Sequence, residues 1–306
     1  MTDTQNEVFK TPVNKIRLFE HGAPGSQNLK LTRKYYTEDM PDGRVKHIVQ
    51  NITDPDIVPY IPDGIGNSTD RQRIPAVLII PGGAFRRLVY NFEGIAAFVL
   101  ECRLPSDEHD NAEDVPLIDA MRAMRVIRGR AQEFGIDEAK IGVMGFSAGG
   151  FMAALLSTAY ESDVYADYKY KDEYDKLSAR PDFAVCSYPV ISIDDCIEAG
   201  KRYMSEEQVL ERISDGKAKI LHKYNPDKLV RPDMPPVFIC ETDDDRTTLS
   251  ENSVGFYMAA RKAGVSAELH IFRTGGHGYG CGDDFAQTGE WKVLFTKWIK
   301  SIGIIS

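Results

Sequence analysis

The segment Gly145–Gly149, GFSAG, holds a serine with a glycine two residues away on either side. It follows the apolar run 141–144 and precedes small and apolar residues that predict a helix over 148–160. So tight a turn from a strand into a helix needs small neighbours, and it exposes the Ser147 hydroxyl at the end of a sheet. The alternative is a glycine-rich turn whose serine only caps the helix. We interpret Ser147 as a nucleophile, because groups that could activate it follow in the chain.

A serine hydroxyl needs a base that takes its proton, and His277 is the candidate. It lies in the segment Gly275–Gly278, GGHG, directly after the segment 267–272 that predicts the last strand. The flanking glycines would let the backbone approach the serine closely. His270 is the competitor, but it lies inside that strand, where a structural role is expected.

The base needs a carboxylate to orient it, and three adjacent aspartates, Asp243, Asp244 and Asp245, follow the strand predicted at 237–240. Three neighbouring side chains cannot all reach one imidazole, so one of them should hold His277 while the other two are solvated. Weaker candidates follow the histidine: Asp283 and Asp284.

Acyl transfer from such a serine also needs N–H donors for the developing oxyanion. The segment Pro81–Ala84, PGGA, follows the strand predicted at 76–80, and its glycines would let backbone N–H groups point into a site. We expect the N–H groups of Gly83, Ala84 and Ala148 to form the oxyanion hole. The alternative is a plain turn.

The elements that must position these residues alternate between apolar segments and amphipathic ones from about residue 75 onward. This rhythm predicts a mostly parallel central sheet with helices on both faces. We expect one domain over 1–306, with residues 1–74 as an extension that adds antiparallel edge strands within 46–60, a loop over 63–73, and an insertion over the active site at 192–235. Strands are predicted at 76–80, 95–100, 141–146, 183–190, 237–240 and 267–272, and helices at 116–134, 148–160, 253–262 and 290–302.

Composition narrows the classes of partner. The chain has 306 residues, 42% hydrophobic and 27% charged, and its 37 Lys and Arg against 46 Asp and Glu give a formal charge of −9. This argues against nucleic acid as a partner, because no excess of positive charge is present. The apolar runs are too short to cross a membrane, and the first residues resemble no export signal, so we expect a cytoplasmic protein. Five scattered cysteines favour a reducing compartment and no structural zinc.

Together these motifs resemble the acetyl-xylan-esterase-like branch of the α/β-hydrolases, a group of carbohydrate esterases and lipase/esterases. The resemblance covers most of the chain, including the segments IRLFEHGAPG, PAVLIIPGGAF, GVMGFSAGG, SARPDFAVCSYPVIS, SENS and GGHGYG. It implies the α/β-hydrolase fold and no metal or organic cofactor. It also implies that Ser147 is the nucleophile, His277 the base and Gly83 an oxyanion residue. The acid of the branch lies six residues before the Glu of the ENS segment, which corresponds to Asp245, with Asp244 as second choice.

The chain departs from the pattern of this branch at four places. Ala84 stands where a third glycine is usual, Phe151 where a histidine is usual, and Thr248-Leu249 where Val-Pro is usual. Only eleven residues, 84–94, join the first two central parallel strands. Since a parallel crossover needs about 10–12 residues, we expect the first covering helix to be shortened or missing. A second subunit could then cover the bare patch, which makes a homo-oligomer one hypothesis.

These observations predict a serine esterase that hydrolyses acyl esters of carbohydrates, acetyl esters first, acting on a small-molecule or oligosaccharide ester. One alternative is a prolyl-oligopeptidase-like peptidase, although no propeller-sized N-terminal domain is present. Another is a weakly active or inactive hydrolase-fold binding protein. The acyl group and the sugar stay open. Aromatic residues near the predicted catalytic loops could stack on a sugar or only pack: Phe85, Tyr90, Phe92, Tyr188 and Tyr279.

Overall fold

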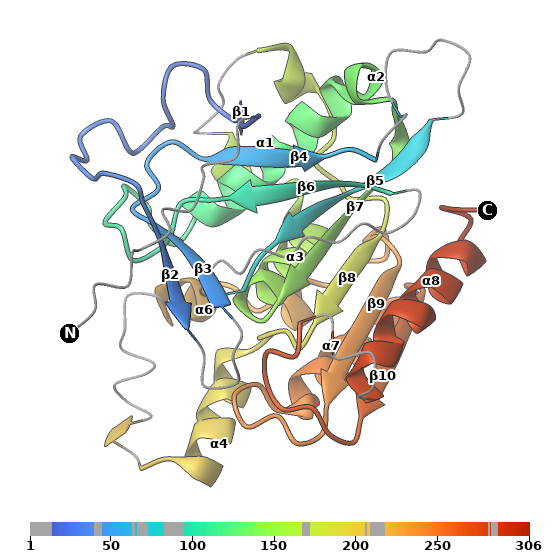
Figure 1. Cartoon of the computed structure of the whole chain (residues 1–306). Coiled ribbons are helices and arrows are strands. Elements are labelled where there is room, and N and C mark those ends of the chain that lie inside the picture. Colours follow the sequence, from blue (N-terminus) through green and yellow to red (C-terminus); the bar gives the residue numbers. More distant parts are fainter. Residues whose placement is uncertain are drawn as a thin grey trace, which may run out of the picture.

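A central sheet runs through the computed structural model, which describes residues 14–39, 45–62, 65, 73–82, 95–166, 172–205, 207–208, 218–280, 282 and 287–306. In this described part, eight strands form the sheet in the order β1-β4-β6-β5-β7-β8-β9-β10 (Figure 1). From β6 to β10 every neighbouring pair is parallel, whereas β4 is antiparallel to β6 and β1 to β4. The strands are β1 (Ile16–Arg17), β4 (Asp56–Tyr60), β5 (Ile74–Ile80), β6 (Ala96–Glu101), β7 (Ile136–Phe146), β8 (Ala184–Ser187), β9 (Val237–Thr242) and β10 (Ala267–Phe272).

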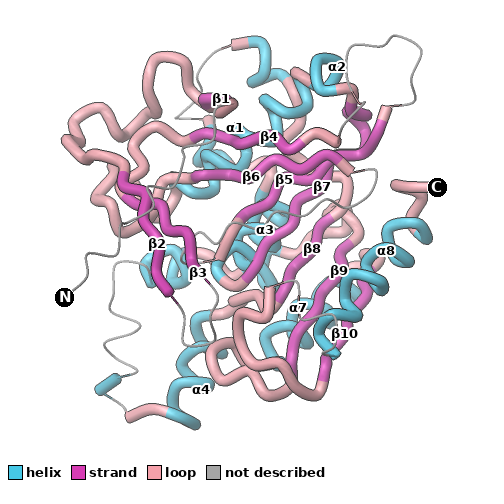
Figure 2. The backbone as a smooth tube through the Cα atoms, viewed as in Figure 1, coloured by secondary structure: helices cyan, strands magenta, loops and turns pink. Residues whose placement is uncertain are grey.

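Helices cover both faces of the sheet, as the alternating pattern predicts. Side chains of β5 point alternately to the two faces. Leu78 and Ile80 pack in one apolar cluster with α1 (Val115–Gly129), α3 (Ala148–Ala159) and α7 (Ser250–Lys262). Val77 and Ile79 belong to a second cluster with α8 (Trp291–Ser301), which Figure 2 shows running beside β9 and β10. The mostly parallel α/β prediction is therefore confirmed.

The segment 116–134, predicted as one helix, divides into α1 and the short α2 (Ala131–Phe134). Gly135 ends α2 in the left-handed conformation, with φ of 67°. Two charged residues of α1 are buried together with its apolar face. Asp119 forms an ion pair with Arg103 at 2.6 Å, and Arg125 lies over the ring of Tyr165. Hydrogen bonds and ring contacts satisfy these groups, so a helix with polar positions can be enclosed on nearly all sides.

The N-terminal extension contributes to two sheets. Within 46–60, where antiparallel edge strands are expected, β4 joins the central sheet antiparallel to β6, and β3 (Val45–Gln50) pairs with β2 (Lys34–Asp39) in a hairpin outside that sheet. Buried charges fix this extension to the sheet, because Arg33 and Lys15 both bind Glu101 of β6, at 3.0 and 2.5 Å. Of the loop predicted at 63–73, only residues 65 and 73 are described.

Between β8 and β9 the insertion 192–235 contains α4 (Ile193–Tyr203), α6 (Ala218–Lys223) and the 3-10 turn η3 (Pro226–Leu229). Figure 1 shows α4 beyond the carboxyl ends of the central strands. Short 3-10 turns also occur at η1 (Asp163–Tyr165), η2 (Glu173–Lys176) and η4 (Gln287–Glu290). None of the helices in the described ranges is long and apolar enough to cross a membrane.

The predicted crossover between β5 and β6 is of the expected parallel type. The prediction that its covering helix is shortened or missing concerns residues 84–94, which lie outside the described residues, as do Gly83 and Ala84 of the expected oxyanion loop.

Candidate active site

Ser147 occupies the junction between β7 and α3, where the backbone takes a conformation that is costly for a residue with a side chain. Its φ is 55° and its ψ is −120°. The Ser147 N–H donates to the carbonyl of Ser187 in β8 at 3.0 Å, and the Ser147 carbonyl accepts the N–H of Phe151 at 3.0 Å. These hydrogen bonds hold the strained turn between the sheet and the first turn of the helix.

The glycines around Ser147 are required by close packing. A Cβ added to Gly145 would lie 1.9 Å from the carbonyl oxygen of Gly149. A Cβ added to Gly149 would lie 2.0 Å from the carbonyl oxygen of Ile80, at the end of β5. Gly82 is also close to this turn, because a Cβ there would lie 2.7 Å from the carbonyl oxygen of Phe146 and 3.2 Å from the Cβ of Ser147. The glycine spacing read from the sequence therefore reflects backbone segments that touch one another.

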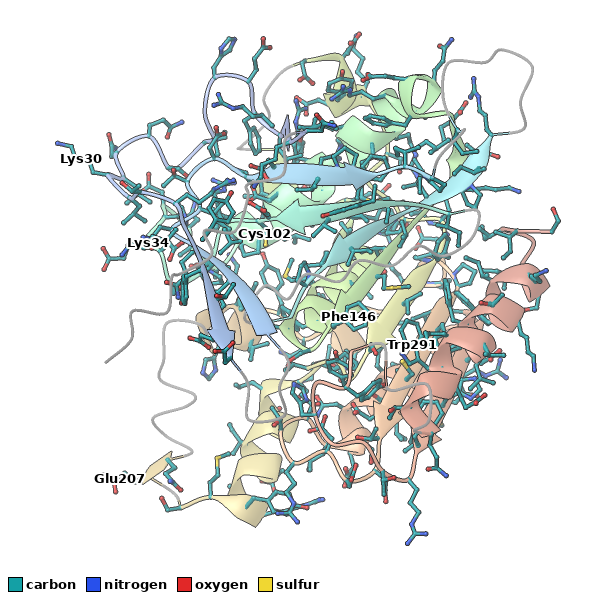
Figure 3. The ribbon with its side chains drawn as sticks, in the orientation of Figure 1. Lys30, Lys34, Cys102, Phe146, Glu207 and Trp291 are labelled. Atoms are coloured by element: carbon teal, nitrogen blue, oxygen red, sulfur yellow. The ribbon has the colours of Figure 1, made fainter. Side chains whose placement is uncertain are left out.

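Beneath this turn an aromatic group supports the end of β7. Phe146 packs edge-on against Trp291 of α8, with ring centroids 6.2 Å apart, and Figure 3 shows the two residues close together. Both side chains are buried. The strand end that carries Ser147 is thus fixed by packing on the α8 face as well as by hydrogen bonds.

His277 lies in the loop that follows β10, and its Nε2 is 2.8 Å from Oγ of Ser147. Its neighbours Gly276 and Gly278 have φ of 60° and 79°, the left-handed region that glycine adopts without steric cost. The competing histidine, His270, has a structural setting instead: its Nε2 is 2.8 Å from Glu268, and its ring packs against Phe238. The structure brings His277, and not His270, to the serine.

Of the three adjacent aspartates, Asp245 reaches the imidazole. Its Oδ2 is 2.7 Å from Nδ1 of His277, and its side chain is fully buried. Asp244 instead accepts the N–H of Gly276 at 2.8 Å, so it fixes the backbone of the histidine loop. A backbone N–H of Asp243 donates to the carbonyl of Phe272. The choice that the residue pattern left open is made by the path of the β9–α7 loop.

Thr248 is a site residue that the sequence reasoning missed. Its hydroxyl donates to Oδ2 of Asp245 at 2.9 Å and lies 3.2 Å from Nδ1 of His277. Its N–H and that of Thr247 donate to Oδ1 of Asp245, at 3.0 and 2.7 Å. The sequence feature that could have pointed to Thr248 was Thr248-Leu249 itself, which stands where Val-Pro is usual. That replacement adds a donor to the acid and leaves the acid in contact with the histidine.

These contacts set the charge of the acid and the tautomer of the base. Burial by itself raises the pKa of Asp245, but the hydrogen bond and charge of His277 and the two threonine N–H groups outweigh it, and the pKa lies below its ordinary value. An ionised Asp245 accepts the Nδ1–H of His277, which leaves Nε2 free to accept the proton of Ser147. The arrangement can remove a proton from the serine hydroxyl as it attacks.

Two of the aromatic residues considered as stacking surfaces are packing residues. Tyr188 is 4% exposed and packs edge-on against His277, with ring centroids 5.1 Å apart. Tyr279 packs against Tyr188 in turn. The hydroxyl of Tyr188 accepts the N–H of Gly280 at 3.1 Å. These side chains fix the histidine loop, whereas Phe85, Tyr90 and Phe92 lie outside the described residues.

For the oxyanion, Ala148 is the one expected donor within the described chain. It is the first residue of α3 and is exposed next to Ser147. N–H groups in the first turn of a helix have no partner within the helix, and the helix dipole favours negative charge there. In the part of the chain that the structure describes, no group of three or more His, Cys, Asp or Glu side chains could hold a metal ion.

Comparison with known proteins adds to this geometry. The BD-FAE family model matches residues 65–259, nearly two thirds of the chain. The chain belongs to the BD-FAE family. Ser147 and Asp245 lie inside the matched range of the BD-FAE model, and His277 lies beyond it.

Relatives with stated activities are ester or xylan hydrolases. An acetylxylan esterase from Xylanibacter ruminicola is 29% identical over 240 residues, covering 74% of this chain and 45% of that protein. An endo-1,4-beta-xylanase B from Butyrivibrio fibrisolvens is 29% identical over 226 residues, covering 70% of this chain and 34% of that protein. The chain thus spans less than half the length of these curated relatives.

A solved structure matches over almost its whole length. An acetyl ester-xyloside bifunctional hydrolase from Caldicellulosiruptor lactoaceticus is 33% identical and has a TM-score of 0.67, covering 96% of this chain and 97% of that one. With the BD-FAE match, this structural likeness supports the α/β-hydrolase fold for the chain.

Proposed function

We propose that this protein is a serine esterase that hydrolyses acyl esters of carbohydrates, acetyl esters first, through Ser147, His277 and Asp245. The observation that carries the proposal is the continuous chain of contacts from Oγ of Ser147 to Nε2 of His277, at 2.8 Å, and from Nδ1 to Asp245, at 2.7 Å. The acetylxylan esterase and acetyl ester-xyloside hydrolase among the relatives support the acyl group and the sugar.

In the first step, Oγ of Ser147 forms a bond to the ester carbonyl carbon while Nε2 of His277 takes the hydroxyl proton. The carbonyl oxygen becomes an oxyanion, and the N–H of Ala148 at the start of α3 would be one of its donors. The bond to the sugar oxygen then breaks, and His277 gives its proton to that oxygen. Asp245 stays ionised throughout and stabilises the imidazolium that forms.

In the second step, water attacks the acyl-serine, and His277 takes its proton as it took that of the serine. The oxyanion collapses, the bond to Oγ breaks, and the proton returns to Ser147. The acid is released and the resting hydrogen bonds form again.

Hydrolysis of p-nitrophenyl acetate by the wild type and by Ser147→Ala tests the proposal. We expect the wild type to turn over and the variant to lose at least about 1,000-fold in kcat. Labelling by a fluorophosphonate probe separates an enzyme from a binding protein, because only an activated serine reacts. A folded wild type that neither hydrolyses the ester nor takes up the probe would contradict the proposal.

The substrate class needs its own comparison. We expect acetylated xylo-oligosaccharides to be deacetylated with a higher kcat/KM than p-nitrophenyl acetate, because contacts with the sugar add binding energy in the transition state. A feruloylated oligosaccharide of the same length is the matched control for the acyl group. Faster release of ferulate than of acetate would overturn the acetyl preference while leaving the esterase proposal in place.

A further inference from the structure

A second acidic side chain, Glu241, lies beside the acid of the proposed triad. It is the last residue but one of β9, and it is 0% exposed. Its Oε1 accepts the N–H of Thr242 at 2.9 Å, and its Oε2 accepts the hydroxyl of Ser253 on α7 at 3.2 Å. Asp245, four residues further along the chain, lies close enough for its negative charge to raise the pKa of Glu241. Across the described residues, no lysine or arginine forms an ion pair with Glu241.

Two carboxyl groups this close inside a protein cannot both be ionised, so the pair must hold a proton. Asp245 accepts four hydrogen bonds: from the N–H groups of Thr247 and Thr248, the hydroxyl of Thr248, and Nδ1 of His277. Glu241 accepts two, one from a backbone N–H and one from a neutral hydroxyl. The greater number of donors, and the contact with the imidazole, stabilise the charge on Asp245.

The directions of the pKa shifts agree with this assignment. Burial raises the pKa of Glu241 well above 4.5, and the negative charge of Asp245 raises it further. Two other titratable groups feel the charge of Glu241, namely Cys240 and Tyr279, and burial raises the pKa of the cysteine to about 12 and that of the tyrosine well above 10. Both are neutral near pH 7, so they add no charge that would ionise or compensate Glu241.

We propose that Glu241 is a positioning residue of the triad, which carries the proton of the acidic pair and donates it in a hydrogen bond to Asp245. The acid arm is then a chain of three groups, Glu241, Asp245 and His277. The added donor holds the carboxylate of Asp245 in the orientation that meets Nδ1 and spreads part of its charge. This inference rests on the proposed function of Asp245 and His277. A purely structural role, in which Glu241 only joins β9 to α7 through Ser253, is the alternative.

Infrared difference spectroscopy tests the protonation directly, without any assay of activity. At pH 7 the wild type should show the carbonyl stretch of a neutral carboxylic acid, and Glu241→Gln should lose it. Glu268→Gln is the matched control, since Glu268 is a half-exposed glutamate on the adjacent strand β10 and its replacement should leave that band unchanged. Identical spectra for the wild type and Glu241→Gln would overturn the proposal even if the esterase proposal stands.

The pH profile of kcat/KM tests the positioning role. Glutamine keeps a donor toward Asp245, so Glu241→Gln should stay within about threefold of the wild type, with the acid limb of the profile at the same pH. Glu241→Met fills similar space but donates nothing. We expect the kcat of Glu241→Met to fall about tenfold with KM little changed. The acid limb of its pH profile should move to higher pH, because a carboxylate of Asp245 that has lost a hydrogen-bond donor stabilises the protonated imidazole of His277 more strongly.

Three results would overturn the positioning role. A shift of the acid limb of Glu241→Gln to lower pH would show that the wild-type glutamate is ionised. Equal losses in the glutamine and methionine variants, or a wild-type profile in the methionine variant, would show that its hydrogen bond to Asp245 is not what matters. If Glu241→Met does not fold, the infrared band and the pH profile of Glu241→Gln test the proposal instead. Absence of esterase activity in the wild type would refute the proposed function but not the protonation.

Discussion

Replacing Gly149 by alanine should damage the site without touching any reacting group. The new Cβ would lie 2.0 Å from the carbonyl oxygen of Ile80 and 2.5 Å from that of Pro81, and both are backbone atoms. To reach the 3.4 Å at which ordinary contact begins, the start of α3 and the end of β5 must separate by about 1.4 Å. The first segment carries Ser147, and the second leads into the expected oxyanion loop.

A displacement of about 1 Å within a catalytic arrangement typically costs about 100-fold in rate. We therefore expect Gly149→Ala to lower kcat on p-nitrophenyl acetate about 100-fold. Overpacking should also lower the free energy of unfolding by about 1–3 kcal/mol. The assay is hydrolysis by the purified variant at a temperature where circular dichroism shows it folded, together with urea unfolding.

Gly255→Ala is the matched control. Gly255 is exposed in the middle of α7, and a Cβ there would meet nothing within 4 Å. We expect wild-type kcat and a gain of about 0.5–1 kcal/mol in the free energy of unfolding, since alanine loses less backbone entropy in a helix than glycine does. A folded Gly149→Ala variant with the kcat of Gly255→Ala would refute the argument that backbone contact at this position places the nucleophile.

Three further predictions concern the acid side of the site. Asp245→Asn should lower kcat by about 10³–10⁴-fold, because the amide favours the wrong imidazole tautomer. Asp244→Asn keeps an acceptor for the N–H of the histidine loop, so its kcat should stay within a few-fold of the wild-type value. Comparable losses of kcat in both variants would contradict the assignment of the acid. Thr248→Val removes a 2.9 Å hydrogen bond to a charged carboxylate, so kcat/KM should fall about tenfold, and an unchanged value would show that the two backbone donors suffice. Folding raises the pKa of Glu241, so above pH 4.5 the folded protein keeps a proton that the unfolded chain releases. The free energy of unfolding of the wild type should therefore fall as pH rises above 4.5. The fall should be at most about 1.4 kcal/mol per pH unit and should end when the raised pKa is reached. Urea unfolding of Glu241→Gln should not show this fall, and a difference between wild type and variant that does not change with pH would contradict the sign.

Local patterns were sufficient to single out Ser147 and His277, the proposed nucleophile and base. The strand, the turn and the helix around Ser147 are close in sequence, and the steric demand of so tight a turn is met by glycines at fixed spacing. His277 was identified by the glycines beside it and by its place after the last strand. Such features are set by backbone sterics within a few residues, and sequence alone shows them.

The residues around the acid needed the structure. Thr248 and Glu241 lie at the two ends of the β9–α7 connection, and no sequence motif around either residue indicates a function. The burial of Asp119 and Arg125 in α1 likewise depends on the fold, because their partners, Arg103 and Tyr165, come from other segments of the chain. The pairing of β3 with β2 also depended on chain path.

The sequence by itself determined the alternation of strands and helices and the choice of Ser147 and His277 as proposed nucleophile and base, because apolar periodicity and turn chemistry act over short stretches of chain. Tertiary structure alone decided which of three adjacent aspartates meets His277, and that a buried glutamate stands behind it. Adjacent side chains differ by only a few ångströms in position, and a carboxyl group's charge depends on every donor brought to it by folding. The path of one loop therefore settled what residue types could not.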